Sequence, residues 1–187
     1  MRSPFSFIIK PLNGRRYDNI KSIGDIQFIT STSQEDHISS NRFAEVVSTP
    51  IGYDGDIKQG DLLLVHHNVF KYYYDMKGRQ QSSHNHFKDD MFFVDQDQFF
   101  MYFNGSEWKC HSKYCFIEPV EVKDYYLVKP GTEEPLVGRI RYINQELIDL
   151  GLSVGDEIAF EPDSEYPFMI NDKKLYRMFT SNIKVKL

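Results

Sequence analysis

The chain has 187 residues, of which 41% are hydrophobic and 15% aromatic, and its formal net charge at pH 7 is −5. This much apolar material can form a packed core, which excludes a disordered chain. The acidic balance argues against a nucleic-acid-binding protein, because such proteins usually carry a basic face. Two cysteines make no disulfide framework, which favours the cytoplasm. No signal peptide is visible, and no apolar run approaches the roughly 20 residues that cross a bilayer, so we expect no membrane association.

Short apolar runs separated by turn residues predict a mostly β fold. In the first half of the chain we expect strands at 5–12, 25–29, 43–47, 62–65, 91–94 and 98–103. The dipeptide Asn104-Gly105 is the strongest hairpin turn of the sequence. The one helical candidate is 144–150, with Asn144 as its N-cap and Gly151 as its stop.

Three connections between the predicted strands of the first half are long enough to have a character of their own. Positions 13–24 are polar and rich in turn residues. Positions 30–42 are rich in Ser and Thr, contain one aliphatic residue, Ile38, and show no periodicity, which predicts an exposed mobile loop. Positions 66–75 and 81–87 flank the turn residues 76–79, which predicts a rim hairpin within 66–90.

A pattern of strand, turn and Gly-Asp-led strand occurs twice, at 43–65 and at 137–160. Ala44-Glu45-Val46 matches Gly138-Arg139-Ile140, and Gly60-Asp61 matches Gly155-Asp156. The two glycines are expected to take a backbone conformation that other residues resist. The repeat predicts two domains, 1–111 and 112–187, of which the first carries extra residues in its loops, where function concentrates.

The order of these motifs resembles that of the GroES-type co-chaperonins, the lids of the GroEL-type chaperonin cage. In that family an Ile-x-Pro-Leu strand opens the domain, here Ile9-Lys10-Pro11-Leu12 and Ile117-Glu118-Pro119-Val120. A Gly-Glu-Val strand and a Val-Gly-Asp strand follow, at the positions of the repeated stretches. The resemblance covers nearly all of the chain as two tandem copies.

The resemblance implies two tandem GroES-like (OB-like) small β-barrels and a mobile loop at 30–42 that binds a GroEL-type chaperonin. The expected function is then to cap the chaperonin, as a homo-oligomeric ring, and to assist protein folding. The second barrel, with two prolines at 130–135, has no mobile loop. The short connection at 48–56 resembles bacteriophage members of the family, which would place the protein in a host cytoplasm. The expected chaperonin-binding residues are Thr30, Ser31, Thr32, Ser33, His37, Ile38, Ser39 and Ser40.

Other readings of the same residues stay open beside this one. The chain could be a non-catalytic structural or assembly protein that kept the barrels and lost chaperonin binding. Tyr72, Tyr73 and Tyr74 could stack bases, but the acidic charge and the alternation of a strand disfavour nucleic acid. We expect no catalysis, because the sequence has no Gly-x-Ser-x-Gly, phosphate-binding loop or His-Glu-x-x-His motif.

No metal or other cofactor is expected either. His66 and His67 fall out of register with His84 and His86 across the predicted hairpin, which favours solvated imidazoles. The sequence Cys110-His111-Ser112-Lys113-Tyr114-Cys115 offers three zinc ligands and lacks a fourth, so we expect ordinary thiols.

Overall fold

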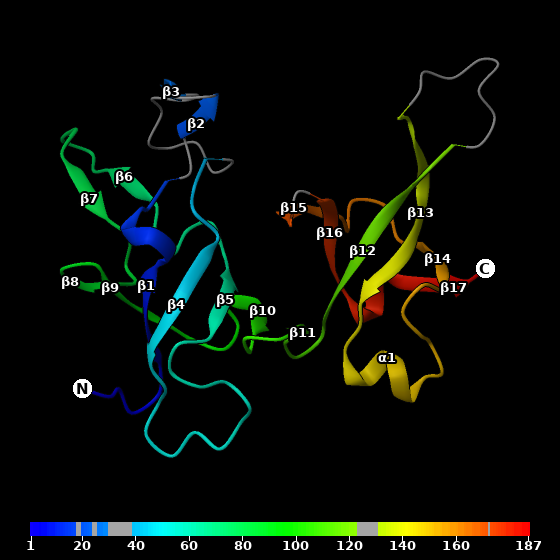
Figure 1. Ribbon diagram of the computed structural model, residues 1–187, viewed down its shortest axis with the longest axis horizontal. Helices are drawn as coiled ribbons and strands as arrows, with labels where there is room; N and C mark the ends of the chain where they lie inside the picture. The colour runs from blue at the N-terminus through cyan, green and yellow to red at the C-terminus, as the bar shows by residue number, and fades with distance from the viewer. Residues whose placement is uncertain (18–19, 24–25, 30–38, 123–130, 172) are drawn as a thin grey trace. The chain divides into compact units, whose positions relative to one another are not determined.

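The computed structural model describes residues 1–187 except 18–19, 24–25, 30–38, 123–130 and 172 (Figure 1). Strands make up 48% of the structure and helices 7%, which confirms the mostly β class. The chain divides into two compact units, Met1–Glu107 and Trp108–Leu187. The division falls between Glu107 and Trp108, just after the turn at Asn104-Gly105 and slightly before the boundary expected from the sequence. No described helix is long and apolar enough to cross a membrane.

The first unit is built on an antiparallel sheet with the strand order β10-β5-β4-β1-β9-β8. Two small hairpins, β2-β3 and β6-β7, are inserted between its strands. The strands are β1 (Phe7–Pro11), β2 (Ile20–Ile23), β3 (Ile26–Ile29), β4 (Phe43–Ser48), β5 (Leu62–Val65), β6 (Tyr72–Tyr74), β7 (Gln80–Ser82), β8 (His86–Lys88), β9 (Met91–Val94) and β10 (Phe99–Phe103), with a 3-10 turn η1 at Leu12–Gly14. The next strand, β11 (Trp108–Cys110), begins the second unit.

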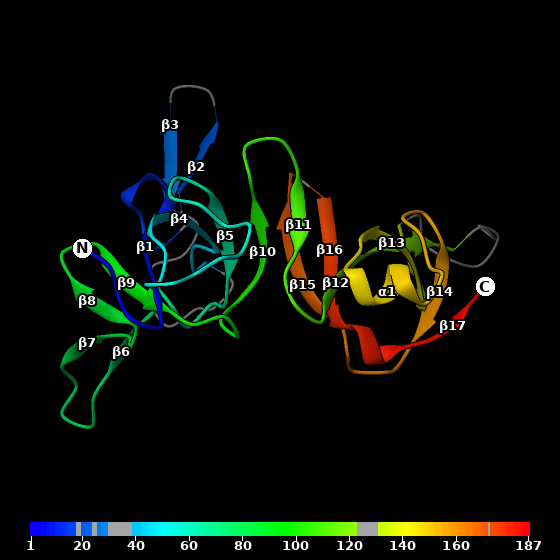
Figure 2. The same cartoon turned by 90° about the horizontal axis from the view of Figure 1, so that it is seen from below.

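The second unit has a six-stranded antiparallel sheet with the order β15-β16-β12-β13-β14-β17. One short helix, α1 (Gln145–Asp149), packs beside it (Figure 2) and buries Leu147. The strands are β12 (Tyr114–Glu121), β13 (Glu133–Tyr142), β14 (Glu157–Phe160), β15 (Tyr166–Ile170), β16 (Lys173–Phe179) and β17 (Ile183–Lys186), with a 3-10 turn η2 at Thr180–Asn182.

The two sheets repeat one another strand by strand. The order β8-β9-β1-β4-β5-β10 in the first unit corresponds to β15-β16-β12-β13-β14-β17 in the second. The registers agree as well, because Ile9 faces Val46 in the first sheet and Ile117 faces Ile140 in the second. Both pairs directly follow an irregularity in the ladder. The predicted match between the two stretches is thus confirmed.

The turns at Gly60-Asp61 and Gly155-Asp156 make the same backbone hydrogen bonds. Gly60 has φ +91° and donates its N–H to Val46 O at 2.9 Å, and Gly155 has φ +94° and donates to Ile140 O at 2.8 Å. In return Val46 N–H donates to Asp61 O and Ile140 N–H donates to Asp156 O, both at 2.9 Å. Positive φ is the conformation that favours glycine, so the sequence prediction for both turns is confirmed.

Each unit has its own hydrophobic core. The first contains Phe7, Phe92 and Phe99, all fully buried, and the ring centroids of Phe7 and Phe99 are 5.4 Å apart in an edge-to-face arrangement. In the second core Cys115 takes the position of Phe7, among Ile117, Ile140, Ile158 and Met178. Gly138 takes the position of Ala44, and a Cβ there would collide with Ile117 Cγ2.

Neither sheet closes into a barrel, because both keep two open edge strands. The structure therefore shows two antiparallel sheets of the same topology. The two-barrel form stays a prediction.

Three local differences from the expected elements are seen. Positions 20–23 form β2, which pairs with β3, although they lie in a stretch predicted as turns. The sequence prediction did not include the edge strand β15, whose Pro167 lacks a ladder donor, which edge positions tolerate. The predicted hairpin forms as β6-β7, with Tyr72 facing Ser82 and a turn closed over 76–78 by the hydrogen bond from Asp75 N–H to Arg79 O, one residue shorter than expected. The stretch 124–128, which matches the predicted strand 25–29, lies outside the described residues.

The predicted helix forms as expected. Asn144 Oδ1 accepts a hydrogen bond from Leu147 N–H at 3.0 Å, and Gly151 ends the helix with φ +85°.

Candidate partner-binding site

The predicted chaperonin-binding residues fall into two groups. Thr30, Ser31, Thr32, Ser33, His37 and Ile38 lie outside the described residues. Ser39 and Ser40 are described, and both are buried, with exposed fractions of 9% and 3%. A buried side chain presents little surface to a partner, so these two serines fit an anchoring role and any contact surface would lie before them.

The two ends of the segment 18–38 are held next to each other. Tyr17 and Ser40 form an isolated antiparallel bridge. Asn41 N–H donates to Arg16 O at 2.9 Å, and the Asn41 side-chain amide donates to Arg15 O at 2.7 Å. Ser40 Oγ donates to His67 O at 2.9 Å. We call the group Arg16, Tyr17, Ser40 and Asn41 the loop base.

A half-open cavity of about 360 Å³ lies beside the loop base. It has apolar walls from Leu12 and Phe43 and a polar rim that includes Arg15. Volumes of this order hold small ligands or single side chains. The Asn41 amide at its wall already donates to two backbone carbonyls, Leu12 O and Arg15 O, so its donors are used within the protein.

The β6-β7 hairpin also contacts the loop base. Tyr72 N–H donates to Tyr17 Oη at 2.8 Å, and the two rings stack with centroids 6.1 Å apart. Arg16 Nη1 donates to Ser82 Oγ at 2.9 Å. The Arg16 guanidinium lies 4.5 Å from the Tyr72 ring centroid and 4.8 Å from that of Phe92, which is within the range of cation–π attraction.

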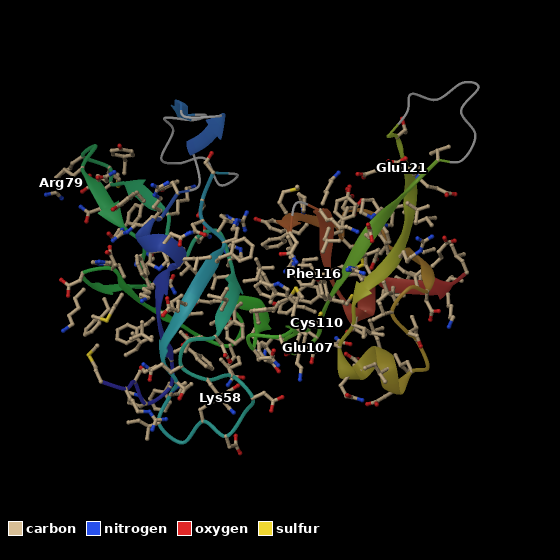
Figure 3. The ribbon with its side chains drawn as sticks, viewed as in Figure 1. Lys58, Arg79, Glu107, Cys110, Phe116 and Glu121 are labelled. Atoms are coloured by element: carbon tan, nitrogen blue, oxygen red, sulfur yellow. The ribbon has the colours of Figure 1, made fainter. Side chains whose placement is uncertain are left out.

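The tip of this hairpin is organised by Asp75. Its carboxylate accepts hydrogen bonds from the backbone N–H groups of Lys77 and Arg79 and from the Arg79 guanidinium, each at 2.9 Å. These hydrogen bonds hold the pKa of Asp75 below its ordinary value. Arg79 lies at the outer end of the hairpin (Figure 3). Gly78, with φ +72°, lies in the turn, which the hydrogen bond from Asp75 N–H to Arg79 O closes at 3.0 Å.

The histidines and cysteines serve local contacts. His86 Nε2 lies 3.0 Å from Asp89 O, and the rings of His66 and His67 are 4.1 Å apart. Cys115 is buried in the second core, and burial raises its pKa to about 12, so the thiol stays protonated at neutral pH. Within the part of the chain that the structure describes, no three His, Cys, Asp or Glu side chains are grouped to hold a metal ion.

Sequence reasoning named Ser40 but did not single out Arg16 or Tyr17, or the contacts of the loop base with the hairpin. The sequence feature that could have pointed to the loop base is Tyr17, an aromatic residue that follows Arg15-Arg16 within a polar stretch. No protein-family model matches the chain, and no curated protein matches it either. The function is therefore argued from the residues and the fold.

Proposed function

We propose that this protein is a GroES-like co-chaperonin that caps a GroEL-type chaperonin and assists protein folding, and that it is a binding protein without catalytic activity. The observation that carries the proposal is the repeated framework at the positions of the family motifs. Ile9-Lys10-Pro11 pairs with Ala44-Glu45-Val46, and Ile117-Glu118-Pro119 pairs with Gly138-Arg139-Ile140 in the same register. Each unit is then a GroES-like, OB-like barrel in the proposed assembly.

The segment 30–42 is the proposed contact with the chaperonin. It occupies the connection between β1 and β4, where the resemblance places the chaperonin-binding loop. A loop that orders on binding loses conformational entropy, which keeps the association reversible. The loop base fixes the end of this segment at Ser40 and Asn41, so the ordering cost falls on the residues before them.

We further propose that several copies form a ring. One loop with Ile38 as its aliphatic anchor binds weakly, and several loops presented together raise the overall affinity by orders of magnitude without any new type of contact. A ring also explains how a chain of 187 residues could cover a large partner.

A second candidate is a structural or assembly protein that kept this framework and lost chaperonin binding. The burial of Ser39 and Ser40 favours it, because it shortens the stretch that could reach a partner. The two candidates differ in one respect that can be measured, which is nucleotide-dependent association with a chaperonin.

The test mixes the full-length protein with a GroEL-type chaperonin in ADP, in ATP and without nucleotide, and measures co-sedimentation and ATPase rate. We expect a complex that requires nucleotide and a lowered ATPase rate. Absence of a complex with chaperonins from several bacterial hosts would favour the structural protein.

A further inference from the structure

The first unit differs from the second by two insertions in the repeated framework. One lies between β1 and β4, where the connection covers 12–42, whereas the connection between β12 and β13 covers only 122–132. The other lies between β5 and β8 and contains the β6-β7 hairpin, whereas β14 and β15 are joined by the short connection 161–165. Insertions into a common framework are where a specific function is expected.

These two insertions are joined to each other. Tyr17 and Arg16 belong to the first insertion, and Tyr72 and Ser82 belong to the second. The two hydrogen bonds between them measure 2.8 and 2.9 Å, and the ring stack and the cation–π contact lie in the same place. Ser40 Oγ adds a third link, because it donates to His67 O just before the hairpin.

The contacts of Tyr17 and Arg16 with the β6-β7 hairpin restrict how the loop base can move relative to the hairpin. Tyr72 offers its backbone N–H and its ring face, so the link uses no freely rotating group on that side. Arg16 is held between the Tyr72 and Phe92 rings and also reaches Ser82, which ties the loop base to β6, β7 and β9 at once. Partial burial raises the pKa of Tyr17, consistent with a hydroxyl that is withdrawn from water.

We propose that Tyr17 and Arg16 are positioning residues that clamp the loop base to the β6-β7 hairpin, so that the hairpin sets the position of the partner-binding loop. The consequence for binding rests on the proposed function, while the clamp itself does not. The proposed contact segment 30–42 ends in the loop base, so when the clamp is loosened that end gains freedom that binding must remove again, and the affinity for the partner falls.

The variant Tyr17→Phe tests the clamp, because it keeps the stacked ring and removes the acceptor for Tyr72 N–H. We expect amide hydrogen exchange at Tyr72 and Asn41 to become about fivefold faster, as the loss of one ordinary hydrogen bond implies. Asn41 is informative because its N–H donates to Arg16 O, not to the deleted hydroxyl. The midpoint of global unfolding by urea is measured beside it, and we expect only a small shift.

Two controls separate the clamp from general loosening. Tyr102→Phe removes another hydroxyl of the same unit, which donates to Asp56 Oδ2 at 3.3 Å, and should leave Asn41 exchange unchanged. Tyr72→Phe keeps both the backbone donor and the ring face, so it should behave as the wild type. Tyr72→Ala keeps the donor but removes the ring stack and the cation–π contact, so it should also make exchange at Asn41 faster.

The same variants are then titrated against a GroEL-type chaperonin with ADP, and we expect Tyr17→Phe to bind several-fold more weakly. Unchanged Asn41 exchange in both Tyr17→Phe and Tyr72→Ala would overturn the clamp. Faster Asn41 exchange with unchanged affinity for the chaperonin would show that the clamp has no role in binding, and it would not contradict the proposed function. If the wild type itself does not bind, the proposed function fails, and the exchange measurement alone decides the clamp.

Discussion

Replacement of Phe7 by alanine is expected to lower the free energy of unfolding by about 3–5 kcal/mol, the range for removing a buried aromatic side chain. Phe7 is fully buried in the first core, with Tyr53 and Phe99 packed edge-to-face at centroid distances of 5.0 and 5.4 Å. Its removal therefore costs both the buried area and the contacts of two neighbouring rings. The change should appear as a lower midpoint of denaturant unfolding with an unchanged slope.

The matched control is Phe5→Ala, two positions earlier in the chain. Phe5 is 85% exposed, so its replacement should change the free energy of unfolding by no more than about 0.5 kcal/mol. Equal effects of the two replacements would contradict the placement of Phe7 in the core and with it the register of β1.

Replacement of Ile38 by aspartate is expected to weaken the proposed nucleotide-dependent complex with a chaperonin by more than about thirtyfold. An isoleucine side chain contributes roughly 1.5–3 kcal/mol when it is fully buried, and a carboxylate in its place would enter an apolar groove without a partner. In a ring each loop carries the same change, so the loss multiplies across the loops that bind. Isothermal titration calorimetry with ADP present measures the effect.

The control for this experiment is Ile51→Asp. Ile51 lies in the β4-β5 connection of the same unit and is 60% exposed, so the replacement introduces the same charge away from the proposed loop. We expect Ile51→Asp to bind as the wild type does. Equal affinity of both variants would contradict the assignment of the chaperonin contact to 30–42.

Local sequence signals predicted most of the framework because each depends on a few neighbouring residues. Gly60 and Gly155 stand out because the turn requires positive φ, and the cap at Asn144 is visible because its side chain and the stop at Gly151 lie within one short helix. The repeat could be recognised for the same reason, since the registers at Ile9 and Ile117 follow from matched motifs.

The candidate site was harder to predict because its contacts join residues far apart in the sequence. Nothing near Tyr17 in the chain indicates that its hydroxyl accepts from Tyr72 N–H, or that Ser40 reaches His67 O. A run rich in Ser and Thr predicts exposure, yet Ser39 and Ser40 are buried. The hairpin register also depends on its turn, where the Asp75 carboxylate accepts hydrogen bonds from the backbone N–H groups of Lys77 and Arg79.

The mass of the assembly in solution tests the central claim most directly, because a lid must close over its partner. Native mass spectrometry and analytical ultracentrifugation of the full-length protein should show one closed species that contains several 22.0 kDa chains and persists on dilution. A monomer at every concentration, with and without chaperonin, would contradict the proposed co-chaperonin function.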